Sequence, residues 1–148
     1  MFIGNPIGDA MNNTEWAFPL AECFHIAAFA LSIGTIAVVD LRLLGLGIKK
    51  QNAGQLLKDT ESWTLIGLAV VIIAGFFIFL SQPDIYLVNE AFWFKMECLL
   101  AAIVFHYAVL RPVVRSGPAP GVDCRGIAII SLLLWIGTAF GGLFIAFV

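Results

Sequence analysis

Residues 23–39, CFHIAAFALSIGTIAVV, contain no Asp, Glu, Lys or Arg. Together with their apolar flanks they extend from about Trp16 to Leu41, and a helix needs roughly 20 residues to cross a bilayer. Similar stretches predict further spanning helices at about 63–80, 91–114 and 126–148. We therefore predict an all-α protein, an integral membrane up-down four-helix bundle in which residues 1–148 form a single transmembrane domain.

The composition agrees with a membrane location. Hydrophobic residues make up 61% of the chain and charged residues 12%, and the mean hydropathy is +0.98. A soluble domain is about half apolar and about a quarter charged, and a disordered chain is still more polar, so both classes are excluded. The net charge of −2 with no basic block predicts no nucleic-acid partner. The lipid bilayer is the expected surrounding.

The distribution of Lys and Arg predicts the orientation. The loop after the first span and the loop after the third contain all but one of them, namely Arg42, Lys49, Lys50, Lys58, Arg111, Arg115 and Arg125. The N-terminal segment and the second loop contain none. Because cytoplasmic loops are enriched in Lys and Arg, we expect a multi-pass protein of the bacterial inner membrane with both termini outside.

Polar residues inside the predicted spans are the candidate functional groups, because they are costly in lipid and face the bundle interior. At 100° per residue, Glu22, His25 and Asp40 fall on one face of the first span. Lys95 and His106 share a face of the third span.

The depth of these groups separates the two histidines. His25 lies roughly 10 Å below the outer end of its helix, and His106 roughly 24 Å down the third span. A tilt of about 20° does not remove such a difference, so one haem clamped by both is not favoured. Lys95 and Met96 lie about 7–9 Å deep, at the level of His25. His106 is then a hydrogen-bonded interior residue or the ligand of a separate site.

Several roles are open to the groups near His25. His25 can bind haem iron through its imidazole, Met96 can offer a thioether, and Lys95 an amine or a cation for a haem propionate. Glu22 can accept the second ring N–H of His25 or neutralise Lys95. We expect Glu22 and Lys95 to lie close enough to interact, and a purely structural ion pair is the cofactor-free alternative.

Two stretches carry a resemblance to a known family. They are HIAAFALSIGTIAVVDLRLLG, from His25 to Gly45, and NEAFWFKMECLLAAIVFH, from Asn89 to His106. They resemble small bacterial four-helix membrane proteins of the HemJ-type protoporphyrinogen oxidase and CopD-like superfamily. In HemJ-type enzymes a first-helix histidine and a third-helix lysine are functional and a b-type haem is bound. The resemblance therefore implies haem b at His25 and Lys95.

Three hypotheses for the function follow. The first is a haem b redox or electron-transfer protein, whose partner is a quinone or a redox protein on the outer side. The second, implied by the CopD-like relatives, is a copper-handling protein, since Cys and Met side chains bind copper. The third is a cofactor-free structural subunit of a larger membrane complex. Other membrane subunits or further copies of the chain are expected partners, and the sequence leaves any enzymatic activity open.

Overall fold

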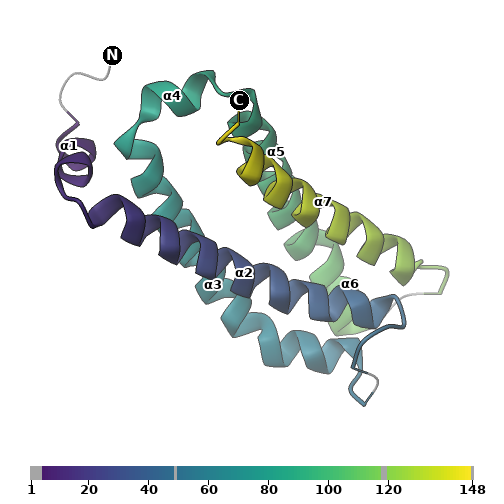
Figure 1. Cartoon of the computed structure of the whole chain (residues 1–148). Helices are drawn as coiled ribbons and strands as arrows, with labels where there is room; N and C mark the ends of the chain where they lie inside the picture. The colour runs from purple at the N-terminus through teal and green to yellow at the C-terminus, as the bar shows by residue number, and fades with distance from the viewer. Residues whose placement is uncertain (1–4, 49, 118–119, 148) are drawn as a thin grey trace.

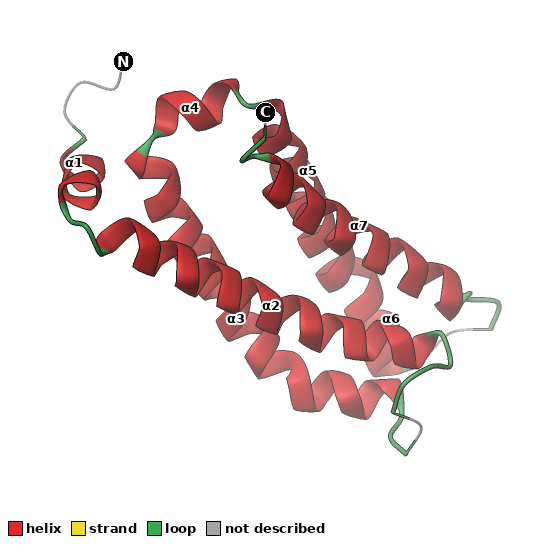
Figure 2. Ribbon diagram, viewed as in Figure 1, coloured by secondary structure: helices red, strands yellow, loops and turns green. Residues whose placement is uncertain are grey.

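The computed structural model describes residues 5–48, 50–117 and 120–147, and within these ranges the secondary structure is entirely helical (Figure 2). Lys49 lies outside the described residues. The helices are α1 (Pro6–Asn13), α2 (Ala17–Leu43), α3 (Ala53–Ser81), α4 (Pro83–Val88), α5 (Glu90–Phe105), the π-helix η1 (His106–Leu110), α6 (Arg111–Ser116) and α7 (Cys124–Phe144). The predicted all-α class is confirmed.

Four helical segments are long and apolar enough to cross a membrane: α2, α3, the continuous run Glu90–Ser116, and α7. Only 22–33% of the residues in their most apolar windows are buried inside the protein. Large hydrophobic side chains cover the outside of the bundle instead, and a soluble protein rarely exposes an apolar surface of this size. The chain is a multi-pass membrane protein with four spanning helices.

Helix boundaries differ from the predicted ones where capping residues decide them. Helix α3 begins ten residues before the predicted Trp63, because Asn52 Oδ1 accepts a hydrogen bond from the Gln55 N–H at 2.8 Å. Helix α7 ends at Phe144, short of the predicted Val148, which lies outside the described residues. The two short helices α1 and α4 were not predicted, because hydropathy finds only long apolar stretches.

The four spans form two antiparallel pairs. Helix α2 packs along α3, and α5 packs along α7. Contacts of α2 with α7 and of α3 with α6 join the pairs. In Figure 1 the pairs are close at the end that carries α6 and diverge toward the end that carries α4 and both termini. We call these ends the α6 end and the α4 end.

The buried apolar core is concentrated toward the α6 end. One cluster lies next to α6 and contains Val39, Leu56, Leu57, Leu110 and Val114. The second lies nearer the middle of the bundle and contains Ile36, Leu68, Ala102 and Trp135. Every member of both clusters is at most 8% exposed. Two polar regions lie against this core, one on each side of the second cluster.

Candidate functional site

His25 of α2 and Lys95 of α5 meet in the α4 half of the bundle. The Nζ atom of Lys95 lies 3.4 Å from Nε2 of His25. The other ring nitrogen, Nδ1, lies 2.9 Å from the main-chain oxygen of Val71 on α3. A carbonyl oxygen only accepts, so Nδ1 carries the proton and Nε2 presents a lone pair toward Lys95. Both side chains are partly buried.

Glycines give both side chains room. A Cβ atom at Gly75 of α3 would lie 2.9 Å from Cε1 of the His25 ring. On α7, a Cβ at Gly141 would lie 3.0 Å from the Cα of Lys95, and one at Gly142 would lie 3.3 Å from its Nζ. Glycine therefore permits these close approaches, and a larger residue would force the neighbouring atoms to shift. The G-x-x-x-G pattern of Gly137 and Gly141 packs α7 against α5 within the chain.

The expected contact between Glu22 and Lys95 is not formed. Glu22 is exposed, and the described residues include no ion pair between its carboxylate and Lys95. Glu22 lies one helical turn nearer the α4 end than His25, and its charge acts on Tyr86 of α4. Burial and this negative charge raise the pKa of Tyr86 above its ordinary value. Lys95 is thus paired with a histidine and not with a carboxylate.

Met96 does not face His25 either. Its side chain is 41% exposed on the outside of the bundle, because successive helical residues differ in direction by about 100° and Lys95 takes the inward position. Cys23 is also exposed, and Cys98 packs toward Gly137. Within the described ranges no group of three His, Cys, Asp or Glu side chains could hold a metal ion. The sulfur atoms of Met96, Cys23 and Cys98 therefore do not surround His25.

His106 belongs to a different region, as its depth predicts. It is 2% exposed and lies one turn from Ala102 of the second core cluster and one turn from Leu110 of the first. Its ring packs edge-on against Tyr107 with centroids 4.9 Å apart. His106 begins the π-helix, in which the Arg111 N–H donates to the His106 oxygen. Pro112 follows and has no N–H to continue the α-helical pattern.

On the level of His106 lies a second polar group, the pair of Asp40 and Ser131, of which the sequence predicted only Asp40. Asp40 of α2 is fully buried, and its Oδ2 accepts a hydrogen bond from the Ser131 hydroxyl of α7 at 2.7 Å. Asp40 belongs to the predicted inward face of its helix, but the hydropathy of α7 does not single out Ser131. At the nearby surface Glu61 forms ion pairs with Arg111 and, at 3.6 Å, with Arg115.

The sequence comparison places the chain in a family. The family profile described as a family of unknown function (DUF6644) matches residues 3–148. The chain belongs to DUF6644. No curated protein and no solved structure matches the chain. This DUF6644 protein has two polar regions inside its bundle, the His25–Lys95 site and the buried groups around Asp40 and His106.

Proposed function

We propose that this DUF6644 protein is a b-type haem-binding redox or electron-transfer protein of the bacterial inner membrane, acting alone or as a subunit of a membrane complex. In this proposal His25 would hold the haem iron through its imidazole, and Lys95 would face the group from the opposite helix pair. The observation that carries the proposal is the hydrogen-bonding state of the His25 ring. Its Nδ1 is held by Val71 while Nε2 is directed at Lys95.

This ring arrangement is the one that a metal-binding histidine needs. A ligating imidazole donates its second N–H to a carbonyl or carboxylate, which fixes both the tautomer and the ring orientation. The Val71 oxygen does this for His25 from α3. His106 differs, because its Nδ1 has no hydrogen-bond partner among the described residues. His25 is therefore the better ligand of the two.

Lys95 and not Met96 is assigned to the other side of the site. Lys95 reaches His25 from α5, whereas the thioether of Met96 is on the exposed face. Its amine can bind the iron directly or pair with a propionate. A bound haem would supply one-electron transfer, and His25 and Lys95 would hold and orient it. Few side chains are buried in the α4 half, whereas the α6 half contains the packed apolar clusters. This difference favours placing the haem in the α4 half.

The charge distribution supports the orientation. The loops and helix ends at the α6 end carry Arg42, Lys50, Lys58, Arg111, Arg115 and Arg125, so this end is assigned to the cytoplasm and both termini to the outside. His25 and Lys95 then lie in the outer half of the membrane. A quinone in the outer leaflet or a redox protein on the outer side is the partner that this depth favours.

The test is a dithionite-reduced visible spectrum of the protein purified after haem-replete expression. We expect b-type bands in the wild type, complete loss in His25→Ala, and retention in the matched control His106→Ala. Lys95→Met should shift or weaken the bands. Circular dichroism checks that each variant is folded. Loss of the bands in His106→Ala alone would contradict the assignment, and a wild type without bands would favour the cofactor-free subunit.

A further inference from the structure

The α6 half of the bundle contains polar atoms that the proposed haem site does not use. Four buried side-chain atoms have no hydrogen-bond partner in the described part of the chain: Asp40 Oδ1, His106 Nδ1, Tyr107 Oη and Trp135 Nε1. Asp40, His106 and Trp135 are each at most 2% exposed. An unpaired polar group costs several kcal/mol in a bilayer, where no solvent compensates it.

These groups are placed on one level of the bundle by the helices that carry them. Asp40 follows Val39 of the first core cluster, and Trp135 belongs to the second cluster. His106 lies between Ala102 of the second cluster and Leu110 of the first. Asp40 and His106 thus lie between the two clusters, and Trp135 and Tyr107 adjoin them from the second cluster. Their four unpartnered atoms indicate a common requirement, which a bound molecule can satisfy.

The chemistry of the four atoms identifies the molecule. The Trp135 indole only donates, whereas the Tyr107 hydroxyl, a neutral imidazole and a neutral carboxylic acid both donate and accept. A metal cation would be opposed by the indole N–H, and an anion would bring an unbalanced charge into the membrane interior, which is costly. Water both donates and accepts, and buried waters typically form about three hydrogen bonds with such groups. Water is the ligand that fits all four.

The charge on Asp40 is not balanced by the protein. Its Oδ2 accepts from Ser131, and no cation of the described chain forms an ion pair with it. Arg42, two residues further on, donates to the Gln51 oxygen. Arg111 pairs with Glu61 across α6 and α3, and the α7 side chain that binds Asp40 is the neutral Ser131. A lone carboxylate in this surrounding is strongly disfavoured relative to its neutral acid.

We propose that Asp40, His106, Tyr107 and Trp135 line a hydrated internal site, and that Asp40 holds an exchangeable proton there. The π-helix that begins at His106 displaces the backbone at this level, and such segments are frequent at functional sites. Glu61 and Arg111 lie near enough to His106 for their charges to act on it. In this proposal their ion pair provides the polar route by which water and protons reach the α6 surface. The site is independent of haem binding.

Infrared spectroscopy tests both parts of the proposal on the full-length protein without added haem. At neutral pH we expect the C=O band of a neutral carboxylic acid in the wild type and its complete loss in Asp40→Asn. The matched control is Asp59→Asn, which removes an exposed carboxylate at the same end of the bundle and should keep the band. In D2O the band should shift, since the proton exchanges with internal water.

Other outcomes overturn the proposal. Absence of the band from the wild type means that Asp40 is ionised, and a band that does not shift in D2O means that no water reaches the site. Loss of the band on adding Na⁺ at constant pH means that the site takes a cation instead. If Asp40→Asn fails to fold, Ser131→Ala replaces it. Removing the hydroxyl that binds Oδ2 should move the band without abolishing it, and an unmoved band excludes Asp40 as its source.

Discussion

The two halves of the bundle differ in how their buried polar side chains are hydrogen-bonded. In the α4 half, His25 and Lys95 are partly buried and satisfy each other and the Val71 oxygen. In the α6 half, Asp40 and His106 are almost fully enclosed, and one buried atom of each has no partner among the described residues. The helix pairs diverge in the first half and are close in the second (Figure 1). Tight packing therefore does not by itself satisfy polar groups.

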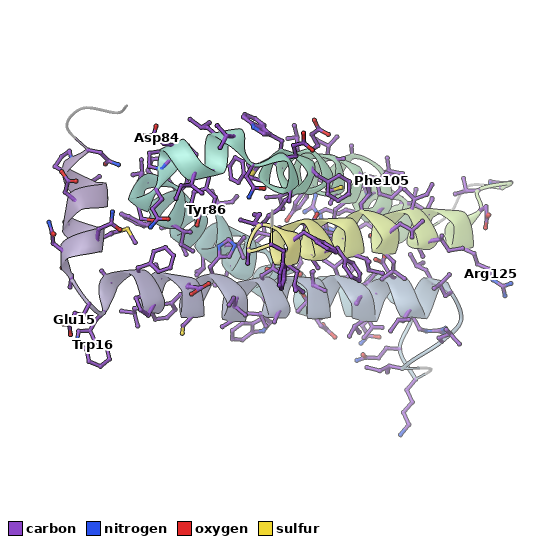
Figure 3. The ribbon with its side chains drawn as sticks, turned by 45° about the horizontal axis from the view of Figure 1, so that its top comes forward. Glu15, Trp16, Asp84, Tyr86, Phe105 and Arg125 are labelled. Atoms are coloured by element: carbon purple, nitrogen blue, oxygen red, sulfur yellow. The ribbon has the colours of Figure 1, made fainter. Side chains whose placement is uncertain are left out.

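The surroundings of the two ends differ as well. At the α4 end, Asn5 and Asn12 of the α1 segment donate to the final main-chain oxygens of α3, Leu80 and Ser81, at 2.5 and 2.8 Å. Tyr86 projects from α4 toward the body of the bundle, whereas Trp16 and Arg125 project outward (Figure 3). Short helices thus cover the end at which the spans are least tightly packed.

The largest difference between the halves is expected for aromatic truncation. Trp135 is 2% exposed in the core of the α6 half, and Phe92 is partly buried near the α4 end. Trp135→Ala should lower the free energy of unfolding by about 3 kcal/mol. This is the low end of the loss seen for such truncations in soluble cores, because in lipid only packing is lost. Phe92→Ala should cost less than half as much. Titration with a denaturing detergent measures both, and equal losses would show that the α4 half is packed as tightly.

An intermediate effect is expected at the α6 surface. Glu61 is 15% exposed and pairs with Arg111, which is 34% exposed. In a double-mutant cycle of Glu61→Ala and Arg111→Ala, we expect a coupling of about 1 kcal/mol. The Glu61→Ala variant leaves Arg111 without this partner, whereas Arg111→Ala leaves Glu61 only the longer contact with Arg115. The same cycle with Arg115→Ala should give a smaller coupling, since that contact is longer at 3.6 Å. Additive losses in the first cycle would show that this ion pair does not stabilise the fold.

The smallest effect concerns Tyr86 at the α4 end. Burial and the charge of Glu22 raise its pKa above that of the unfolded chain. The folded state therefore favours the neutral phenol. The resulting stabilisation of the folded state is complete below about pH 10, the ordinary pKa of tyrosine. It is lost as the pH rises through the pKa of Tyr86 in the folded state. Ultraviolet titration of tyrosinate, with Tyr86→Phe to assign the signal, should show a lower pKa in Glu22→Gln, and an unchanged pKa would mean that Glu22 does not act on it.

The meeting of His25 and Lys95 could be anticipated from the sequence, because position along a straight helix sets both depth and direction. The same arithmetic separates His25 from His106. It does not decide whether Lys95 or its neighbour Met96 turns inward. That depends on the rotation of α5 about its axis, which the contact of Lys95 with Gly141 on α7 sets. Likewise, Glu22 has no ion pair with Lys95 because the Lys95 side chain reaches the deeper His25.

By itself the sequence determined the membrane location and the four spans, because these follow from hydropathy. The helical period placed His25 and Asp40 on the inward face of the first span, but it also placed there Glu22, which is exposed. Only the tertiary structure decided which polar groups meet. The bond between Ser131 and Asp40 joins residues far apart in the chain. The π-helix at His106, between α5 and α6, was likewise not visible in the sequence pattern. Such pairings depend on the rotation and crossing of whole helices, which are set by side-chain packing between them and not by the local pattern of any one helix.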